Sequence, residues 1–140
     1  MLHDLPEEIR GRIPTIRVIA MPKDTNPFGD IFGGWLVSNM DLAGGTHCYK
    51  EIGERVATVG INEMSFCKPV FVGDEVSFYT QVKSSGKTSV SVKVESWAFR
   101  RNTKNYDKVT EGVFTYVCID ENNQPKEIIK ESYGETRKAV

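Results

Sequence analysis

The stretch DTNPFGDIFGGWLVSNMDLAGGTHCYKEIG, from Asp24 to Gly53, decides how the rest of the chain must be arranged. Its first part, Asp24 to Asp30, is rich in Pro, Gly, Asp and Asn, which are the residues that form turns. The part that follows is mostly small or apolar and carries Asp41 in its interior. The stretch therefore predicts a polar loop that leads directly into a long helix.

The expected helix begins at Ile31 or Phe32 and continues to about Glu51. Asp30 is predicted to be its N-cap, because a carboxylate accepts hydrogen bonds from first-turn amides and suits the positive end of the helix dipole. Gly53 is predicted to end the helix, because glycine adopts the left-handed conformation that is common after helices. The apolar residues lie nearly all round, which is typical of a helix enclosed by other structure.

One face of this helix has little side-chain bulk. Glycine inside a helix costs about 1 kcal/mol relative to alanine, and this helix carries Gly44 and Gly45 together. Two interpretations of this face are open. It can pack tightly against a sheet or a second subunit, or a substrate can pass over it. The residues of the face are Gly34, Ser38, Asp41 and Gly45.

The segments around the helix predict an antiparallel sheet, because apolar residues alternate and turn residues separate the runs. One strand precedes the helix and four follow it, so we expect an α+β fold with the helix on one face of the sheet. Residues 1–125 are expected to form a single domain, and the polar segment after Asp120 is expected to be loosely held, with residues 126–140 as a tail. The predicted strands cover residues 13–21, 55–66, 78–82, 88–99 and 109–120, and the turns include Gly73-Asp74, Ser84–Lys87 and 100–107.

Composition excludes several classes of protein. A chain of 140 residues has the usual size of one domain, and its 39% hydrophobic and 26% charged residues are ordinary for a globular protein. A net charge of −1 gives no electrostatic basis for binding nucleic acid or an anionic membrane. No apolar run has the length of a signal peptide or of a membrane span, so a cytoplasmic protein is expected.

Cysteine usage predicts neither disulfides nor a metal site. The three cysteines Cys48, Cys67 and Cys118 are far apart and form no CxxC pair, so we expect small buried hydrophobes in a reducing compartment. His47 and Cys48 are adjacent in the helix, and adjacent helical positions cannot both face one metal ion.

Asp41 is the strongest candidate for chemistry. It stands between Met40 and Leu42, too far into the helix to be a cap, and burial among apolar neighbours would raise its pKa towards that of a general base. The unpaired amides at the helix start, around Gly33 and Gly34, can stabilise an oxyanion on an acyl carbon. A base and oxyanion donors on one helix indicate acyl transfer or hydrolysis.

Two motifs resemble those of the acyl-CoA thioesterases of the hot-dog fold, in particular the YciA-like branch. The first reads PxDTNxxGDIFGGW with an Asp one to two turns later, and the second reads VxxNxMxFxKPVxVGD from Val59 to Asp74. The resemblance covers about residues 13–120. It implies an antiparallel sheet wrapped around the helix, dimers that join their sheets edge to edge, and commonly a trimer of dimers. It also implies active sites at the dimer interface that contain elements of both subunits.

The resemblance also implies roles for individual residues. Asp41 matches the catalytic carboxylate, which activates water or attacks the thioester directly. Asn26 matches a loop residue that reaches the neighbouring subunit's site and positions water or substrate. Gly34, with Gly33 as the alternative, matches the amide that polarises the thioester carbonyl, and Phe28 stands where it would affect acyl-chain selection. On this interpretation Asn26 serves one active site, while Gly34 and Asp41 serve the other.

Coenzyme A carries several phosphates, so its recognition needs cations and free amides near a groove. It would be bound as part of the substrate and product, and hydrolysis by this route requires no metal or organic cofactor. The candidates from strand ends and turns are Lys68, Ser84, Gly86, Lys87, Arg100 and Arg101.

Two other functions occur on the same fold. Hot-dog hydratases and dehydratases pair a His with an acid on the helix, but His47 is six residues beyond Asp41 and off its face. A non-enzymatic acyl-CoA sensor of the regulatory kind usually carries a DNA-binding segment, and no such segment is visible in the sequence. A homo-oligomeric acyl-CoA thioesterase is therefore the function that the sequence favours.

Overall fold

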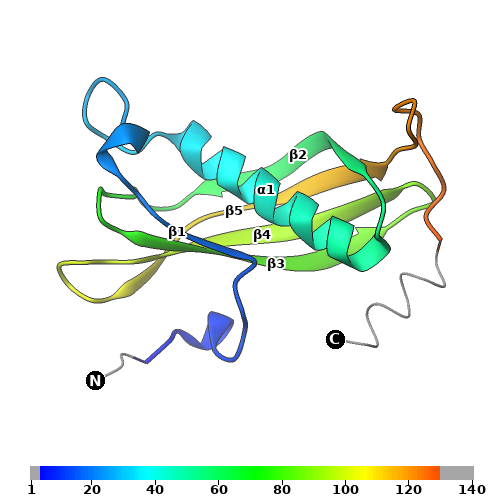
Figure 1. Ribbon diagram of the computed structural model, residues 1–140. Coiled ribbons are helices and arrows are strands. Elements are labelled where there is room, and N and C mark those ends of the chain that lie inside the picture. The colour runs from blue at the N-terminus through cyan, green and yellow to red at the C-terminus, as the bar shows by residue number, and fades with distance from the viewer. Residues whose placement is uncertain (1–3, 130–140) are drawn as a thin grey trace.

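The computed structural model describes residues 4–129, and within them one long helix lies across one face of a five-stranded antiparallel sheet (Figure 1). The strand order is β1-β3-β4-β5-β2, so β1 and β2 are the two edges. The α+β architecture expected from the sequence is confirmed. The elements are η1 (Glu7–Ile9), β1 (Ile16–Ile19), η2 (Pro22–Asp24), α1 (Gly33–Ile52), β2 (Val56–Phe66), β3 (Glu75–Ser85), β4 (Ser89–Phe99) and β5 (Tyr106–Cys118).

The helix has the expected length but a different start. Its N-cap is Phe32, which makes no side-chain cap hydrogen bond, so the prediction that Asp30 caps the helix was wrong. Asp30 instead closes the preceding loop, because its carbonyl accepts a 2.7 Å hydrogen bond from the Asn26 amide. At the other end Gly53 has φ 69° and its amide donates to the Tyr49 carbonyl at 2.7 Å, as predicted for a left-handed cap.

The strands agree with the sequence pattern except near prolines and turns. β1 is shorter than predicted, because Pro14 and Pro22 flank it and cannot donate to a ladder. Ser84 was expected in a turn and instead lies inside β3, which runs on to Ser85 before the hairpin. The predicted loop that begins at Arg100 is shorter than expected, since β5 starts at Tyr106 and pairs it with Phe99.

The core fills the space between α1 and the sheet. Alternation in β4 turns Val90, Val92 and Val94 towards the helix, as the period-two pattern predicts. The helix approaches β5 closely at Gly44, where an added Cβ would overlap the hydroxyl of Tyr116. Tight packing on the sheet therefore explains Gly44, and it does so because no larger side chain fits there.

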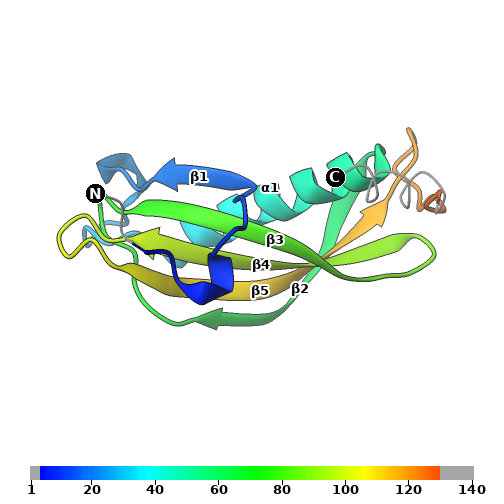
Figure 2. The ribbon, with the colours of Figure 1, turned by 90° about the horizontal axis from the view of Figure 1, so that it is seen from below.

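The opposite face of the sheet carries a second, smaller cluster that the sequence did not reveal. Figure 2 shows the N-terminal segment with η1 on this face, while α1 lies behind the sheet. Ile9 is fully buried there against Tyr79 and Trp97. The polar appearance of the first residues concealed this single apolar contact.

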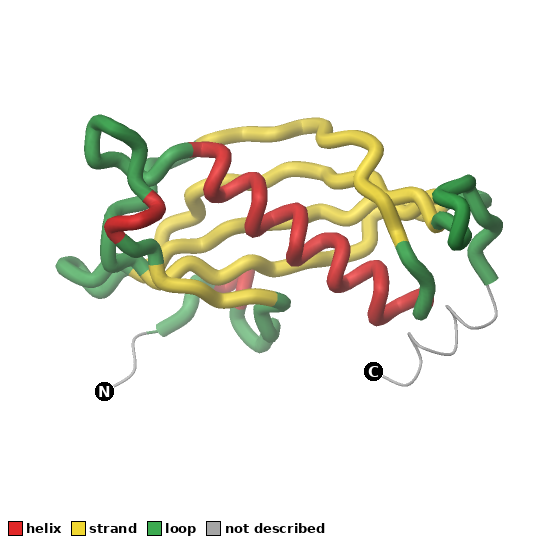
Figure 3. Tube along the Cα trace, turned by 45° about the horizontal axis from the view of Figure 1, so that its top comes forward, coloured by secondary structure: helices red, strands yellow, loops and turns green. Residues whose placement is uncertain are grey.

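The segment after β5 packs against the sheet end, seen with the helix and strands in Figure 3. Ile119 and Pro125 form a bridge, and the Lys126 amide donates to the Cys118 carbonyl at 2.8 Å. Ile128 is buried, and its amide donates to the Lys87 carbonyl at 3.0 Å. The expected loose tail is thus wrong for residues 120–129, and the rest of that expectation, residues 130–140, lies outside the described residues.

The cysteines are free and differ in exposure. Cys48 and Cys118 are buried as expected, whereas Cys67 is exposed. Burial raises the pKa of the Cys48 thiol to about 12, so this residue stays protonated near neutral pH. Within residues 4–129 no helix combines the length and the hydropathy that crossing a membrane requires.

Candidate active site

An open groove of about 380 Å³ runs between α1 and the edge strand β2, and Asp41 forms part of its wall. The helix supplies one side of the groove, and the first residues of β2 supply the other. This position places the one carboxylate singled out from the sequence beside a space that a ligand can enter. The lining residues are Asp41, Leu42, Gly45, Thr46, Tyr49, Arg55, Val56, Thr58 and Tyr116.

Asp41 is held by two hydroxyl groups from the sheet. It is half-exposed rather than buried, so the expected burial of its carboxylate is not found. Thr58 Oγ1 donates a 2.6 Å hydrogen bond to Asp41 Oδ1, which restrains the carboxylate at the wall of the groove. Tyr116 Oη donates to the Asp41 carbonyl at 2.9 Å, and burial, followed by the Asp41 charge, raises the pKa of Tyr116.

Thr58 is a functional candidate that the sequence analysis missed. Part of the signal was present, because Val56 and Thr58 are two residues apart in β2, which puts them on one face of the sheet, and Val56 packs against the core beneath the helix. A threonine at such a position, two residues from an apolar one, is a polar group facing the core side of the sheet. The sequence did not predict that β2 lies beside α1 in such a way that Thr58 is next to Asp41.

The loop before the helix fixes Asn26 in one orientation. Asn26 Oδ1 accepts hydrogen bonds from the amides of Phe28 at 2.9 Å and Asp30 at 3.1 Å, which is the turn role expected for an asparagine. Its Nδ2 makes no hydrogen bond to any described residue, so it is a donor available to a ligand or water. Phe28 projects from the same loop with its side chain 88% exposed.

The first amides of α1 are available as donors. Gly33 and Gly34 are exposed, and within residues 4–129 their amides have no backbone or side-chain acceptor. Such amides point along the helix axis away from the later turns. Gly34 and Asp41 are separated by about 10 Å along the axis at 1.5 Å per residue. The Gly34 amide therefore points away from the Asp41 carboxylate of its own chain.

The candidate residues for coenzyme A do not form one cluster. Lys68, Arg100 and Arg101 surround a hollow of about 440 Å³ that also contains Phe71 and Val72. Ser84, Gly86 and Lys87 lie at the β3–β4 hairpin, and the Lys87 carbonyl there bonds the C-terminal segment.

Arg100 is a structural residue. It is buried, and its guanidinium contacts Asp74 at 2.6 Å and Asp107 at 3.0 Å and donates to the Pro69 carbonyl at 2.9 Å. Arg100 and then Lys68 hold the pKa of Asp107 below its usual value. Arg101 is exposed and makes no ion pair with the described residues, so it is the better cation for a ligand phosphate.

His47 faces the sheet and not the groove. Its Nδ1 lies 2.7 Å from Thr80 Oγ1 in β3, and its Nε2 lies 3.5 Å from Glu51 Oε1. This position is off the face of Asp41, as the helical spacing predicted. The described residues contain no group of three or more His, Cys, Asp or Glu side chains that could hold a metal ion.

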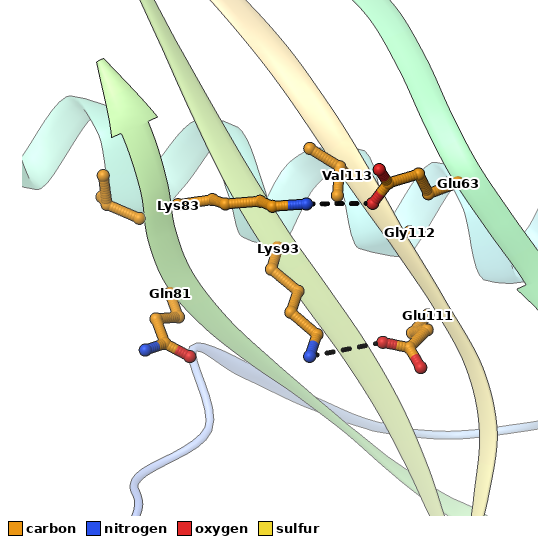
Figure 4. A pocket seen from close by; sticks show the side chains of 8 residues that line it. Glu63, Gln81, Lys83, Lys93, Glu111, Gly112 and Val113 are labelled. Atoms are coloured by element: carbon orange, nitrogen blue, oxygen red, sulfur yellow. Dashed lines mark hydrogen bonds and ion pairs between the residues drawn. The ribbon is translucent and has the colours of Figure 1, made fainter.

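A second hollow lies on the outer face of the sheet and is filled with paired charges. Figure 4 shows Lys83 directed at Glu63 and Lys93 directed at Glu111, with α1 visible behind the strands. The Lys83–Glu63 contact is 3.0 Å and the Lys93–Glu111 contact is 3.4 Å. Because each of these cations has a carboxylate partner, the hollow is a surface ion-pair network.

A long helix on a five-stranded antiparallel sheet, with a carboxylate in an open groove beside the helix, defines the hot-dog class of acyl-thioester enzymes. A family model described as the Thioesterase superfamily matches residues 28–103. The acyl-CoA thioester hydrolase YciA of Escherichia coli (strain K12) is 44% identical over 128 residues, which are 89% of this chain and 93% of that protein. The chain belongs to the thioesterase superfamily, in the branch of YciA-like acyl-CoA thioester hydrolases.

Solved structures agree with this assignment. A hexameric hotdog fold thioesterase of Campylobacter jejuni superposes with a TM-score of 0.82 at 38% identity, covering 89% of this chain and 96% of that one. An acyl-CoA hydrolase from Staphylococcus aureus was solved in complex with butyryl coenzyme A, coenzyme A and coenzyme A disulfide. It superposes with a TM-score of 0.74 at 26% identity, covering 89% of this chain and 85% of that one. That hydrolase was also solved as variants with an asparagine or an aspartate replaced by alanine.

Proposed function

We propose that this protein hydrolyses acyl-CoA thioesters to a free carboxylic acid and coenzyme A. The observation that carries the proposal is the Asp41 carboxylate, held by Thr58 at 2.6 Å and facing an open groove. An ionised carboxylate in that position can accept a proton from a water molecule that attacks the thioester carbon, or can attack that carbon itself. In either case the thiolate of coenzyme A leaves, and water supplies the oxygen of the acid.

We propose that a second copy of the chain stabilises the oxyanion. The amide of Gly34 points away from Asp41 in the same chain, and the two are separated by about 10 Å along the helix. One thioester carbonyl cannot accept from that amide while its carbon meets the Asp41 of the same chain. This separation supports our proposal that Gly34 and Asp41 of one chain serve two different sites, in place of the single site expected from the sequence.

We propose that two copies meet at the edge strand β2. It is 11 residues long, its outer edge is unpaired within the described residues, and Val59, Ile61 and Phe66 on it are exposed. A long apolar edge of this kind is a template for pairing with another strand. We place a dimer interface here, with the two β2 strands antiparallel about a two-fold axis.

This pairing would complete the site. Antiparallel strands bring the Thr58 end of one β2 beside the Phe66 end of the other. Phe66 packs on the first turn of its own helix, since a Cβ added at Gly33 would lie 3.3 Å from Phe66 Cε1. The helix start of one protomer, with the amide of Gly34, would thus lie beside the Asp41 of its partner.

Asn26 acts from the same side as the partner's helix start. Its free Nδ2 donates to the attacking water or to the thioester carbonyl, while Oδ1 stays engaged in the loop. Each site then combines Asp41 and Thr58 of one protomer with Asn26 and Gly34 of the other. We propose further that three such dimers form a hexamer, as the hexameric C. jejuni thioesterase supports.

The coenzyme A phosphates are proposed to lie at the helix-start end, where Lys68 and Arg101 offer cations. Lys68 also contacts Asp107 at 3.1 Å, so it would exchange or share that partner. Arg101 needs no such exchange. Phe28 at the loop tip would contact the substrate near the thioester. Coenzyme A enters as part of the substrate, and the proposed route needs no metal or organic cofactor.

A thioesterase assay with a matched pair of variants tests the proposal. Release of free thiol is followed with acetyl-, octanoyl- and dodecanoyl-CoA for the wild type, Asp41→Asn and Asp4→Asn. We expect hydrolysis by the wild type and a fall in kcat of roughly 100-fold or more for Asp41→Asn. Asp4 is exposed and outside the groove, so Asp4→Asn should keep the wild-type rate. Equal rates for the wild type and Asp41→Asn would contradict the mechanism, and absence of turnover on every substrate would contradict the function.

A further inference from the structure

The groove continues past Asp41 towards the C-terminal end of α1. Asp41, Gly45 and Tyr49 follow at intervals of four residues, so they lie on one side of the helix with about 6 Å between neighbours. All three line the groove, and Leu42 and Val56 border it. The Tyr49 side chain stands at the far end and is 58% exposed. The wall beyond Asp41 is therefore largely apolar.

Most of the polar groups in this wall already have protein partners. The hydroxyls of Thr58 and Tyr116 donate to Asp41, at its carboxylate and its carbonyl. The Arg55 guanidinium donates to the Asp120 carbonyl at 3.2 Å and to Asn123 Oδ1 at 3.0 Å. A hydrocarbon chain needs no such partners, whereas the amide-bearing arm of coenzyme A does. The wall therefore suits the acyl part of a thioester.

The two adjacent glycines of α1 differ in what they accommodate. At Gly44 an added Cβ would overlap the Tyr116 hydroxyl, so packing on the sheet requires glycine there. At Gly45 an added Cβ would lie 3.6 Å from Tyr116 Cε1, which is an ordinary van der Waals contact. Alanine would be the better helix former at this position. Packing within the chain thus does not require glycine at position 45. The groove beside Asp41 does offer a reason, because the absence of a side chain at Gly45 leaves the groove open.

We propose that the groove from Asp41 to Tyr49 binds the acyl chain, and that Gly45 determines whether a chain can extend beyond the first turn from the catalytic carboxylate. This inference rests on the proposed thioesterase function and names its substrate class, acyl-CoAs whose chains pass Gly45. Gly45 lies about 6 Å from Asp41 along the helix, and Tyr49 lies about 12 Å from it. An acetyl group is too short to reach Gly45, whereas an octanoyl chain must pass it.

The test compares one long and one short substrate on graded variants. We measure kcat/KM for octanoyl-CoA and acetyl-CoA with the wild type, Gly45→Ala and Gly45→Val, and with Lys50→Val as the control. Lys50 is exposed on the same helix and does not line the groove. A blocked methylene in an apolar pocket changes specificity by about tenfold or more, so the octanoyl to acetyl ratio should fall at least that much in Gly45→Val and by less in Gly45→Ala. Lys50→Val should keep the wild-type ratio.

Two results would overturn the inference while the wild type remains an active thioesterase. One is an unchanged octanoyl to acetyl ratio in both Gly45 variants. The other is an equal loss on both substrates. Gly45→Ala keeps the test informative if valine disturbs folding, because its Cβ fits beside Tyr116 and it should melt at or above the wild-type temperature. A wild type that hydrolyses neither substrate would count against the proposed function itself.

Discussion

At the scale of single residues, Asn26 combines a role in its loop with the catalytic role that we propose for it. Its Oδ1 accepts hydrogen bonds from the amides of Phe28 and Asp30, and its Nδ2 is the group that we propose contacts the substrate. The loop role could be predicted from the sequence because Asn favours turns. The donor role followed from a family resemblance, and the structure supports it by showing which end of the amide is occupied.

Replacing Asn26 with aspartate separates these two roles. Asn26→Asp keeps an oxygen for the loop amides and removes the donor, so we expect an unchanged melting temperature and a kcat lowered roughly 10- to 100-fold. Thiol release and thermal unfolding measure the two effects. Asn26→Ala should lower both, because it also removes the loop hydrogen bonds. Wild-type turnover by Asn26→Asp would show that Nδ2 has no part in the reaction.

Thr58 is predicted to position the Asp41 carboxylate. Thr58→Val keeps the shape and removes the 2.6 Å hydrogen bond, so the carboxylate should lose its fixed orientation. Hydrogen bonds to charged groups contribute about 1.5–3 kcal/mol, and we expect kcat to fall about tenfold with little change in KM. Thr58→Ser retains the hydroxyl and should recover most of the rate. A change confined to KM, or no recovery with serine, would argue against positioning.

At the scale of elements, the N-terminal segment is an anchor that the sequence concealed. Ile9 stands between the charged residues Glu8 and Arg10, with Leu5 as the other apolar residue that reaches this cluster, and periodicity cannot identify so few buried residues in a short segment. The structure buries it on Tyr79 and Trp97, on the face of the sheet opposite α1. The helix, in contrast, was predictable to within a residue or two at either end, because loop residues, small apolar residues and Gly53 all indicate the same boundaries.

Removing this anchor should destabilise the fold measurably. Ile9→Ala deletes a fully buried side chain, and such changes cost about 2–5 kcal/mol; we expect the lower end, because the cluster is small. The free energy of unfolding is measured by denaturant titration. Ile13→Ala is the matched control, since Ile13 is 89% exposed and should change stability by less than about 0.5 kcal/mol. Equal stability of Ile9→Ala and Ile13→Ala would mean that η1 does not anchor the chain.

At the scale of the whole molecule, the carboxylates at the sheet ends and on its outer face predict loss of stability in acid. Arg100 lowers the pKa of Asp107, Lys108 lowers that of Glu111, and the Met21 amide lowers that of Asp24. A lowered folded-state pKa stabilises the protein above the unfolded values, here 3.8 for Asp and 4.5 for Glu, and this contribution is lost as pH falls through the folded-state values.

Thermal unfolding between pH 6 and pH 2.5 checks this expectation. The melting temperature should be nearly constant above pH 5 and should fall steadily below about pH 4.5. Asp107→Asn removes one of the titrating groups, so it should be less stable at pH 6 and should show a shallower acid slope. An acid slope as steep as that of the wild type would mean that Asp107 does not contribute to it.

The parts of the site that the sequence could not predict are those that depend on how the elements and the proposed subunits are arranged in space. The sequence predicted Asp41 from its position inside an apolar helix and the helix-start glycines from their free amides, while the prediction for Asn26 rested on the family resemblance. It predicted one site for Gly34 and Asp41, since both are on one helix, whereas the direction of the helix-start amides supports the proposal of two sites. Thr58 could not be predicted as a site residue, because its hydrogen bond to Asp41 depends on β2 lying beside α1 in the tertiary structure.

The central claim, a thioesterase site divided between two protomers, has a direct test in mixed assemblies. Asp41→Asn and Asn26→Asp chains are coexpressed in equal amounts with different affinity tags, and the doubly tagged oligomers are assayed for thiol release. A mixed dimer then has one site with both lesions and one site with neither. Random pairing makes half of the dimers mixed, so doubly tagged hexamers should have about one quarter of the wild-type rate, and doubly tagged dimers about one half. If Asp41 and Asn26 of one chain served the same site, every site would carry a lesion, and the mixture would be no more active than its two components.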